Sequence, residues 1–337
     1  MNKKYSELAE LFRSEKTDEE ILDFLLNYHK NDIADMMAGM TEEERKRLYH
    51  LLGAQKVAEI FKYIEEPRKY IRELSVESAA RVISEMDSDD AVDLLEDLDP
   101  EEKEQIVRML DEDAKKDVKM LLSYDEEEIG SCMTTNYICI PEDLTIKQAM
   151  SELVKQAGEN DNIMTIYVVD EKGVFAGAID LKDLIRAREN THLKDLVLKS
   201  YPYVTDHEKI DDCMDRILDY AEDSIPVLSE DKRILGVITS EDLIEMVDNE
   251  MGEDYAKLAG LTAEEDLKEP IVQSMKKRLP WLIILLFLGM GVSSVVGLFE
   301  NVVAVLPIVI CFQSLVLDMA GNVGTQSLAV TIRVLMD

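Results

Sequence analysis

The spacing of apolar residues changes along this chain and divides it into three kinds of structure. From Lys4 to about Glu128, apolar residues recur at helical spacing, as in Leu8, Leu11 and Phe12. After Gly130, β-branched runs alternate with short helical segments, and the C-terminal part is dominated by apolar residues. The pattern therefore predicts a helical first part, an α/β middle and a membrane-embedded end.

Helix-start signals subdivide the first part. Thr41-Glu-Glu-Glu44 is a capping-box pattern, and Asp99-Pro100 places an N-cap residue before a proline at the first helical position. Short helices that follow one another in this way are typical of a degenerate helical-hairpin repeat, so we expect a small helical solenoid. The expected helices include residues 55–64, 75–86, 88–98, 100–110 and 112–123.

The middle part repeats one order of elements. Residues 163–170 and 173–179 predict two strands joined by a turn, and a helix opens at Leu181. The same order returns in residues 223–228 and 233–239, followed by a helix that opens at Ser240. We therefore expect two copies of one α/β module.

The C-terminal part carries a membrane-length apolar run. Residues 280–299 contain no charge over about 20 residues, enough to cross a hydrocarbon core of roughly 30 Å as a helix. A second run, 302–317, leads into the polar, Gly-bearing patch 318–327. Polar residues at membrane depth favour a path for a solute, whereas two plain anchors would leave this patch unexplained. Residues 276–278, Lys-Lys-Arg, predict that the large N-terminal part lies in the cytoplasm, and the charged pattern after Met1 predicts no signal peptide.

The charge balance narrows the function classes. Among 337 residues, 71 are acidic and 37 are basic, for a net charge of −34. Such a charge repels nucleic acid and suits either self-repulsion in solution or the collection of cations. The four cysteines show neither zinc-site nor disulfide spacing. A nucleophile paired with a base, a phosphate loop and a histidine cluster are all missing, so we expect no enzyme.

Carboxylates gather at two places. Asp89, Asp90 and Asp93 stand at the beginning of an expected helix, where interaction with the helix dipole is an alternative explanation. Six more, between Asp242 and Asp254, largely share neighbouring helix faces and repel one another by a few tenths of a kcal/mol per pair. A divalent cation would neutralise them, and Mg²⁺ needs only one or two carboxylates. EF-hand spacing is absent, and a solvated acidic helix remains the alternative.

The repeated middle resembles a tandem of cystathionine-β-synthase-type (CBS) domains, with Cys132-Met-Thr-Thr near the start of the first. The resemblance implies an α/β fold that often dimerises and often binds an adenine nucleotide such as ATP. The second module has the matching Thr239 and Asp242, whereas the first has Asp180 in place of a hydroxyl, followed by Lys182 and Asp183. The candidate nucleotide-binding residues are Lys182, Asp183, Thr239 and Asp242. For Lys182 and Asp183, the alternative is that they are ordinary exposed residues at a helix start.

The order of parts, with the patch Ala320-Gly-Asn-Val-Gly-Thr-Gln-Ser327 after Pro280-Trp-Leu, resembles the MgtE family of Mg²⁺ channels and transporters over the whole chain. The resemblance implies a multi-pass homodimer in the cytoplasmic membrane. It also implies passive Mg²⁺ conduction and closure when cytoplasmic Mg²⁺ fills acidic sites between the helical and CBS domains. The expected parts are an α-helical N domain (1–129), CBS domains (130–190 and 191–248), a connecting, plug-like helix (249–279) and a partial α-helical transmembrane domain of about two spans (280–337).

The resemblance also implies roles for individual residues. Asn322 is expected to line the pore. The family has about five spans, so a chain ending at Asp337 is expected to carry the complete sensor and an incomplete pore. The rival hypothesis is a membrane-anchored, nucleotide-sensing CBS protein. The regulatory Mg²⁺ ligands implied are Glu59, Asp89, Asp93, Asp211, Asp242, Glu245, Glu250, Glu253 and Asp254.

Overall fold

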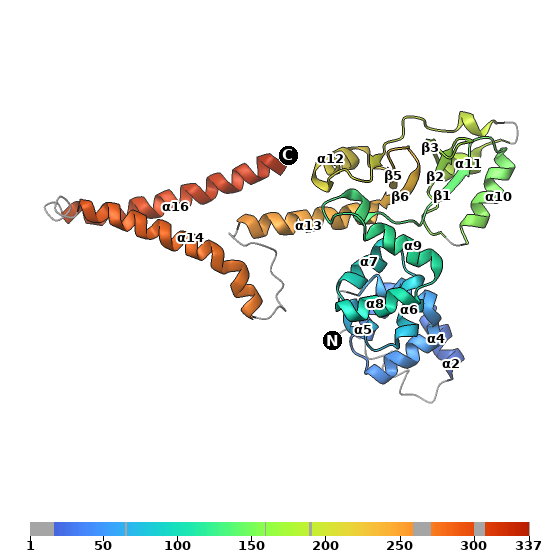
Figure 1. The fold of residues 1–337 in the computed structure, drawn as a ribbon, viewed down its shortest axis with the longest axis horizontal. Helices are drawn as coiled ribbons and strands as arrows, with labels where there is room; N and C mark the ends of the chain where they lie inside the picture. The colour runs from blue at the N-terminus through green and yellow to red at the C-terminus, as the bar shows by residue number, and fades with distance from the viewer. Residues whose placement is uncertain are drawn as a thin grey trace. The chain divides into compact units, whose positions relative to one another are not determined.

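The computed structural model describes residues 17–64, 66–158, 160–188, 191–258, 271–299 and 307–336. The chain divides into two compact units, Met1–Leu243 and Ile244–Asp337, and each is described by itself. The first unit holds a helical part and two α/β modules, and the second holds long helices (Figure 1).

The helical part is a succession of short helices that pack on neighbours two or more places along the chain. α6 packs against α8, α7 against α9 and α4 against α6, as expected for stacked helical hairpins. The prediction of a helical solenoid is thus confirmed. The helices are α2 (Asp18–Leu25), α3 (Lys30–Met37), α4 (Glu42–Phe61), α5 (Pro67–Ile71), α6 (Val76–Ser84), α7 (Ser88–Glu96), α8 (Pro100–Met109) and α9 (Glu112–Leu121).

The capping signals act as the sequence indicates. The Thr41 N–H donates to the Glu44 carboxylate at 2.8 Å, and the Glu44 N–H donates to the Thr41 hydroxyl at 3.4 Å. Asp99 and Glu102 form the equivalent box before Pro100. Helix α4 is interrupted at Gly53, which has φ of 76°. The expected helix 55–64 is therefore the second half of α4, after this kink.

An ion pair lies inside the helical part. The Arg45 Nε donates to Glu73 at 2.9 Å, and the two side chains are only 8% and 10% exposed. Arg45 also donates to the backbone oxygen of Met37 at 3.3 Å. The guanidinium thereby ties α3 and α4 to the turn that precedes α6.

The two α/β modules have the same topology. Each is a three-stranded sheet in which the first strand pairs parallel to the second and the second antiparallel to the third. The four predicted strands are present. Each module also has a leading strand, and a helix directly after that strand, which the sequence analysis did not predict. The first module comprises β1 (Ile138–Pro141), α10 (Ile146–Gln156), β2 (Thr165–Val169), β3 (Phe175–Asp180) and α11 (Leu181–Arg186). The second comprises β4 (Val204–Thr205), α12 (Ile210–Tyr220), β5 (Ser224–Leu228), β6 (Ile234–Thr239) and α13 (Ser240–Leu258).

The segment that precedes each module forms a β-bridge with the last strand of the other module. Thr134 pairs with Val237 of β6, and Leu198 pairs with Ala178 of β3. A Cβ atom at Gly177 would lie 2.5 Å from the Leu198 oxygen, so this approach requires glycine. Gly236 is held equally close, 2.7 Å from the Thr134 oxygen. The exchange makes the two modules one body.

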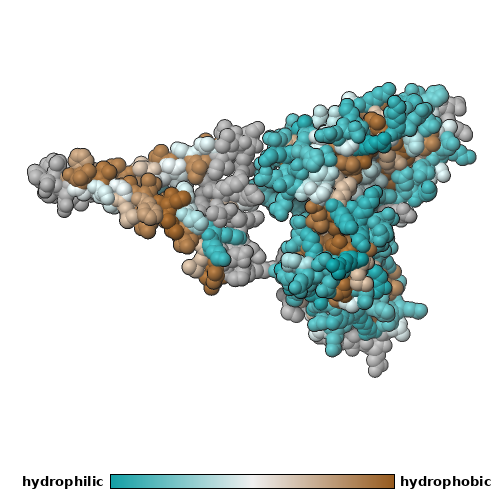
Figure 2. All heavy atoms as spheres, in the orientation of Figure 1, coloured by the Kyte–Doolittle hydropathy of each residue, from teal (hydrophilic) through white to brown (hydrophobic). Residues whose placement is uncertain are grey.

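The second unit contains the end of α13 and two long helices, α14 (Ile271–Leu298) and α16 (Pro307–Met336). Figure 2 shows hydrophobic residues gathered along these helices. In the described part of the chain one segment, Ser274–Leu298, is long and apolar enough to cross a membrane. The second expected span begins in residues that the structure does not describe and stays a prediction. Helix α16 continues through the Gly-Asn patch, where the Thr325 hydroxyl donates to the Gly321 oxygen at 3.1 Å.

The buried ion pair gives a first prediction. Replacing Arg45 with methionine leaves the Glu73 carboxylate buried without its counter-charge, so we expect the free energy of unfolding to fall by about 3–5 kcal/mol. Lys46→Met is the matched control, because Lys46 pairs with Glu42 on the exposed face of the same helix and is worth about 0.5 kcal/mol or less. Urea unfolding of the full chain in detergent, followed by circular dichroism, measures both. Equal midpoints for the two variants would contradict the prediction.

Candidate functional site

A cavity of about 240 Å³ lies in the first unit, where the ends of α4 and α6, the start of α7 and the start of α13 meet. Its lining is rich in carboxylates and contains two lysines, Lys30 and Lys62. The acidic residues that line it, hereafter the acidic cavity, are Glu59, Glu85, Asp87, Asp89, Asp90, Asp161, Glu241 and Asp242.

Hydrogen bonds fix the start of α7 against the first module. The Asn136 side-chain amide donates to Asp87 at 2.7 Å. The Thr135 N–H donates to the Ser88 hydroxyl at 2.9 Å, and Ser88 is buried. Because Asp87 is the N-cap residue of α7, Asp89 and Asp90, two and three positions further along, occupy its first turn and line the cavity.

The start of α13 supplies the opposing carboxylate. The Thr239 N–H donates to the Asp242 carboxylate at 2.7 Å, and the Asp242 N–H donates to the Thr239 hydroxyl at 3.3 Å. This reciprocal capping holds the Asp242 side chain at the end of β6, among the lining residues of the acidic cavity.

Asp89 is the carboxylate of the cavity whose charged form is disfavoured by both burial and its neighbours. Its Oδ1 atom is buried and has no hydrogen-bond partner within the described residues. Burial raises the pKa of Asp89 well above its ordinary value, and the charges of Asp242, Asp90 and Asp87 raise it further. A buried, unsatisfied carboxylate oxygen is costly, so this position favours an added positive charge.

Two further titrating groups share this environment. Burial raises the pKa of Asp90 to about 7, although Lys62 acts in the opposite direction. Burial also raises the pKa of Asp242, partly offset by its hydrogen bonds with Thr239. All three shifts have the same physical origin, which is the removal of neighbouring carboxylates from water.

Lys62 is the cation closest to this cluster. Its Nζ lies 3.2 Å from Glu241, 3.7 Å from Asp87 and 4.0 Å from Asp90. Burial disfavours the charge on Lys62, but the three carboxylates outweigh this effect and raise its pKa. The lysine therefore stays protonated and links α4, α7 and α13.

The donor set suits a hard cation that keeps part of its hydration shell. Carboxylate oxygens are the ligands that Mg²⁺ prefers, and Mg²⁺ usually retains several waters. In the described ranges no group of three or more histidine, cysteine or acidic side chains is already arranged as a metal cage. The acidic cavity thus offers carboxylates to a hydrated ion and not a closed coordination shell.

The structure brings together only part of the predicted ligand set. Glu59, Asp89 and Asp242 line the acidic cavity, and Glu59 also pairs with Lys30 at 2.9 Å. Asp93 and Asp211 are exposed and do not line it. In the second unit, Glu245 and Glu250 are exposed on α13, Asn322 is exposed on α16, and the side chains of Glu253 and Asp254 lie outside the described residues.

The candidate nucleotide residues fall in two places. Lys182 and Asp183 are exposed on α11, at the end of β3. Thr239 and Asp242 occupy the equivalent turn of the second module and line the acidic cavity.

Sequence reasoning missed several lining residues, among them Lys62, Asp87 and Glu241. The Asp87-Ser-Asp-Asp run marks a helix start, and this signal could have identified Asp87 as its N-cap. No local pattern identifies Lys62, because its partners come from distant parts of the chain.

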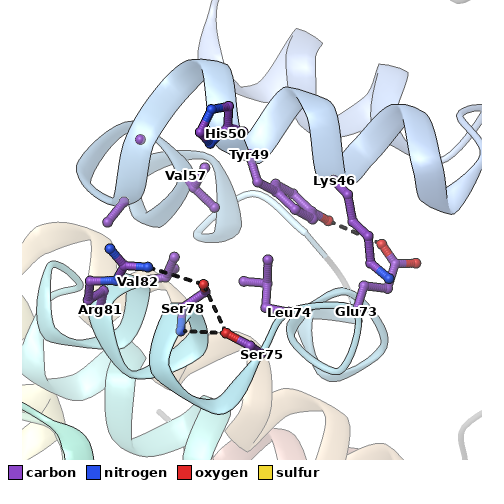
Figure 3. A pocket seen from close by; sticks show the side chains of 12 residues that line it. Lys46, Tyr49, His50, Val57, Glu73, Leu74, Ser75, Ser78, Arg81 and Val82 are labelled. Carbon is purple, nitrogen blue, oxygen red and sulfur yellow. Dashed lines mark hydrogen bonds between the residues drawn. The ribbon is translucent and has the colours of Figure 1, made fainter.

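A larger cavity of about 610 Å³ lies within the helical part, between α4 and α6 (Figure 3). The Tyr49 hydroxyl points toward Glu73, and Ser75 and Ser78 bond to each other. The charge of Glu73 is already neutralised by Arg45. This cavity does not gather unpaired carboxylates, so the acidic cavity is the better candidate for a cation.

The described residues form a helical domain and a pair of like α/β modules with an acidic cavity, and they include one helix long and apolar enough to cross a membrane. The model of the MgtE intracellular N domain matches residues 28–127, and that of the CBS domain matches 127–190 and 193–249. The magnesium transporter MgtE of Enterococcus faecalis is 38% identical over 337 residues, which are 99% of this chain and 74% of that protein. The chain therefore belongs to the MgtE family of magnesium transporters.

Another relative and two solved structures match between 63% and 73% of the chain. MgtE of Thermus thermophilus is 32% identical over 217 residues, 63% of this chain and 48% of its own length. The crystal structure of the soluble part of a magnesium transporter matches with a TM-score of 0.70 and 29% identity, covering 73% of this chain and 98% of that one. The cytosolic domain of the Mg²⁺ channel MgtE in complex with ATP matches with a TM-score of 0.64 and 27% identity, covering 72% and 99%.

The raised pKa of Asp90 gives a second prediction. With an ordinary pKa of 3.8 and a folded-state pKa of about 7, the folded chain binds a proton that the unfolded chain lacks between these values. The free energy of unfolding therefore falls as the pH rises through this window. Without divalent ions, we expect Asp90→Asn to reduce that fall by roughly 1–2 kcal/mol between pH 5 and pH 8.

Urea unfolding at several pH values, with a chelator present, measures this change. Asp97→Asn is the matched control, because Asp97 is exposed at the other end of α7. Parallel pH profiles for the wild type and Asp90→Asn would show that the pKa of Asp90 is not raised in the folded chain.

Proposed function

We propose that this chain takes part in Mg²⁺ transport across the cytoplasmic membrane and that Mg²⁺ bound at the acidic cavity controls it. The proposal rests on one observation: Asp89 and Asp242, from distant parts of the chain, share a cavity in which an Asp89 oxygen is buried without a partner. Membership of a magnesium-transporter family supports the same ion as both cargo and regulator.

The control follows from charge. When Mg²⁺ is scarce, the carboxylates of α7 and α13 repel each other and favour separation of the elements that carry them. When Mg²⁺ binds, it neutralises them and favours the state in which they are close. An ion that binds one state more tightly shifts the balance by that difference in affinity.

The rest of the mechanism is proposed from the family resemblance. The segment 249–279 transmits the state of the acidic cavity to the membrane part, two copies of the chain form the pore, and Asn322 lines it. The large N-terminal part lies in the cytoplasm, as the basic run 276–278 directly before the uncharged run 280–299 supports.

Limited proteolysis of the full chain in detergent, titrated with Mg²⁺, is the direct test. We expect protection to appear at millimolar Mg²⁺ and the Asp89→Asn variant to need about tenfold more, because the charge count of the ligands sets the affinity. Ca²⁺ at the same concentrations compares the two hard cations.

Glu101→Gln serves as the control, since Glu101 is an exposed carboxylate on α8 outside the acidic cavity. Its midpoint should match the wild type. If cleavage of the wild-type chain were indifferent to Mg²⁺, the sensor would have to be abandoned.

A second proposal is that the CBS pair binds ATP, as the cytosolic domain of a similar Mg²⁺ channel does in its crystal structure. The turn at Thr239 and Asp242 faces the acidic cavity, whose negative charge opposes a triphosphate. The equivalent turn of the first module presents Lys182 and Asp183 on the surface. We therefore place the nucleotide at the turn between β3 and α11.

This placement predicts that Lys182→Met and Asp183→Ala each weaken ATP binding by about tenfold, the loss expected for one charged hydrogen-bonding group. The Asp242→Asn variant should leave ATP affinity within about twofold of the wild type, because its turn is not used. Fluorescence titration with a labelled ATP measures all three. Weaker binding in Asp242→Asn alone would move the nucleotide to the second module.

A further inference from the structure

Lys62 occupies the position of a counter-ion in the acidic cavity. It follows the last residue of α4, and its side chain is 29% exposed. Its Nζ lies within 4.0 Å of carboxylates from two other elements, Asp87 and Asp90 of the α7 start and Glu241 of α13. One ammonium group thus partly neutralises the carboxylates that a divalent ion would neutralise.

We propose that Lys62 is a tethered cation that holds α4, α7 and α13 together in the absence of Mg²⁺ and that Mg²⁺ must displace to bind. The inference rests on the proposed function, because it assigns to Lys62 the setting of the Mg²⁺ threshold at the same cavity.

The chemistry of the two cations makes them competitors. A lysine ammonium is a compact charge on a flexible stem, so it can leave a carboxylate without disturbing the backbone. Mg²⁺ demands near-octahedral oxygen coordination, which an ammonium bonded to the same oxygens obstructs. Because Lys62 is attached to the chain, its local concentration is high and independent of the ion concentration outside.

The ion pairs of Lys62 leave part of the cavity to the ion. Within the described residues, its ion pairs go to Asp87, Asp90 and Glu241, whereas the Asp89 Oδ1 has no hydrogen-bond partner. Lys62 therefore neutralises one side of the acidic cavity and does not satisfy Asp89. A divalent ion gains by reaching the Asp89 Oδ1, but it must displace the ammonium to use the carboxylates that Lys62 occupies.

The same contacts give the lysine at this position two effects. Without any cation, the carboxylates of α7 and α13 would meet unscreened in a partly buried space. Lys62 stabilises this arrangement at low Mg²⁺ and at the same time weakens the binding of Mg²⁺. Both effects of one side chain can be measured in a single titration.

The test is limited proteolysis of the full chain in detergent, titrated with Mg²⁺, for the wild type and Lys62→Met. We expect the variant to be cleaved faster without Mg²⁺ and to reach half-maximal protection at roughly threefold to tenfold lower Mg²⁺, because one opposing charge is gone from the site. Lys62→Arg keeps the charge and should stay close to the wild type in both respects.

Lys103→Met is the matched control for net charge. Lys103 is also 29% exposed and pairs with Glu96 at 3.9 Å, but it does not line the acidic cavity. Its midpoint should equal that of the wild type. A similar downward shift in Lys103→Met would assign the effect to the overall charge of the chain and overturn the role of Lys62.

The outcomes also separate this inference from the proposed function. If the wild type responds to Mg²⁺ but Lys62→Met has an unchanged or higher midpoint, Lys62 is a structural bridge and the inference is wrong while the sensor stands. If the wild type does not respond to Mg²⁺, both fall. A variant that is degraded at every Mg²⁺ concentration, with Lys62→Arg behaving as the wild type, would likewise assign Lys62 a structural role only.

Discussion

The first unit depends on holding several carboxylates close together and partly out of water. Asp89 of α7 and Asp242 of α13 share one cavity, and burial raises the pKa of each. Such an arrangement is unfavourable unless positive charge offsets it. The ammonium of Lys62 supplies some of this charge within the chain, and a hydrated divalent ion can supply the rest. On the proposed function, the stability of this region is therefore linked to the concentration of that ion.

This linkage requires the carboxylates to be positioned from separate parts of the chain. The exchanged segments around Thr134 and Leu198 join the two modules into one body, and the Tyr167 and Ser224 hydroxyls bond across them at 2.6 Å. The contacts of Ser88 with Thr135 and of Asp87 with Asn136 attach α7 to this body. The start of α7 is thus fixed by polar contacts, which are easier to rearrange than a packed apolar interface.

The sequence was sufficient to predict elements whose signals are local. The capping box at Thr41, the Asp99-Pro100 helix start and the repeated strand pairs all appear as expected. The short leading strand β4, of two residues, has too little pattern to be recognised and exists because β5 pairs with it. In the site, Asp89 and Asp242 were identified through a family resemblance. Lys62 was not, because its role depends on partners that lie 25 or more residues away in the chain.

The absence of a ready-made cage among the described residues bears on how such a cavity can regulate transport. A rigid, fully carboxylate shell would bind the ion tightly and would remain occupied over the whole range of cellular concentrations. On the proposed function, a cavity that leaves Mg²⁺ partly hydrated and already contains a lysine would bind the ion weakly. Weak binding keeps the site partly filled at millimolar concentrations, where a change in Mg²⁺ produces the largest change in occupancy. Burying the charged Asp89 carboxylate is costly, and an added cation relieves that cost, so on the proposed function the occupancy of the cavity affects the stability of the fold.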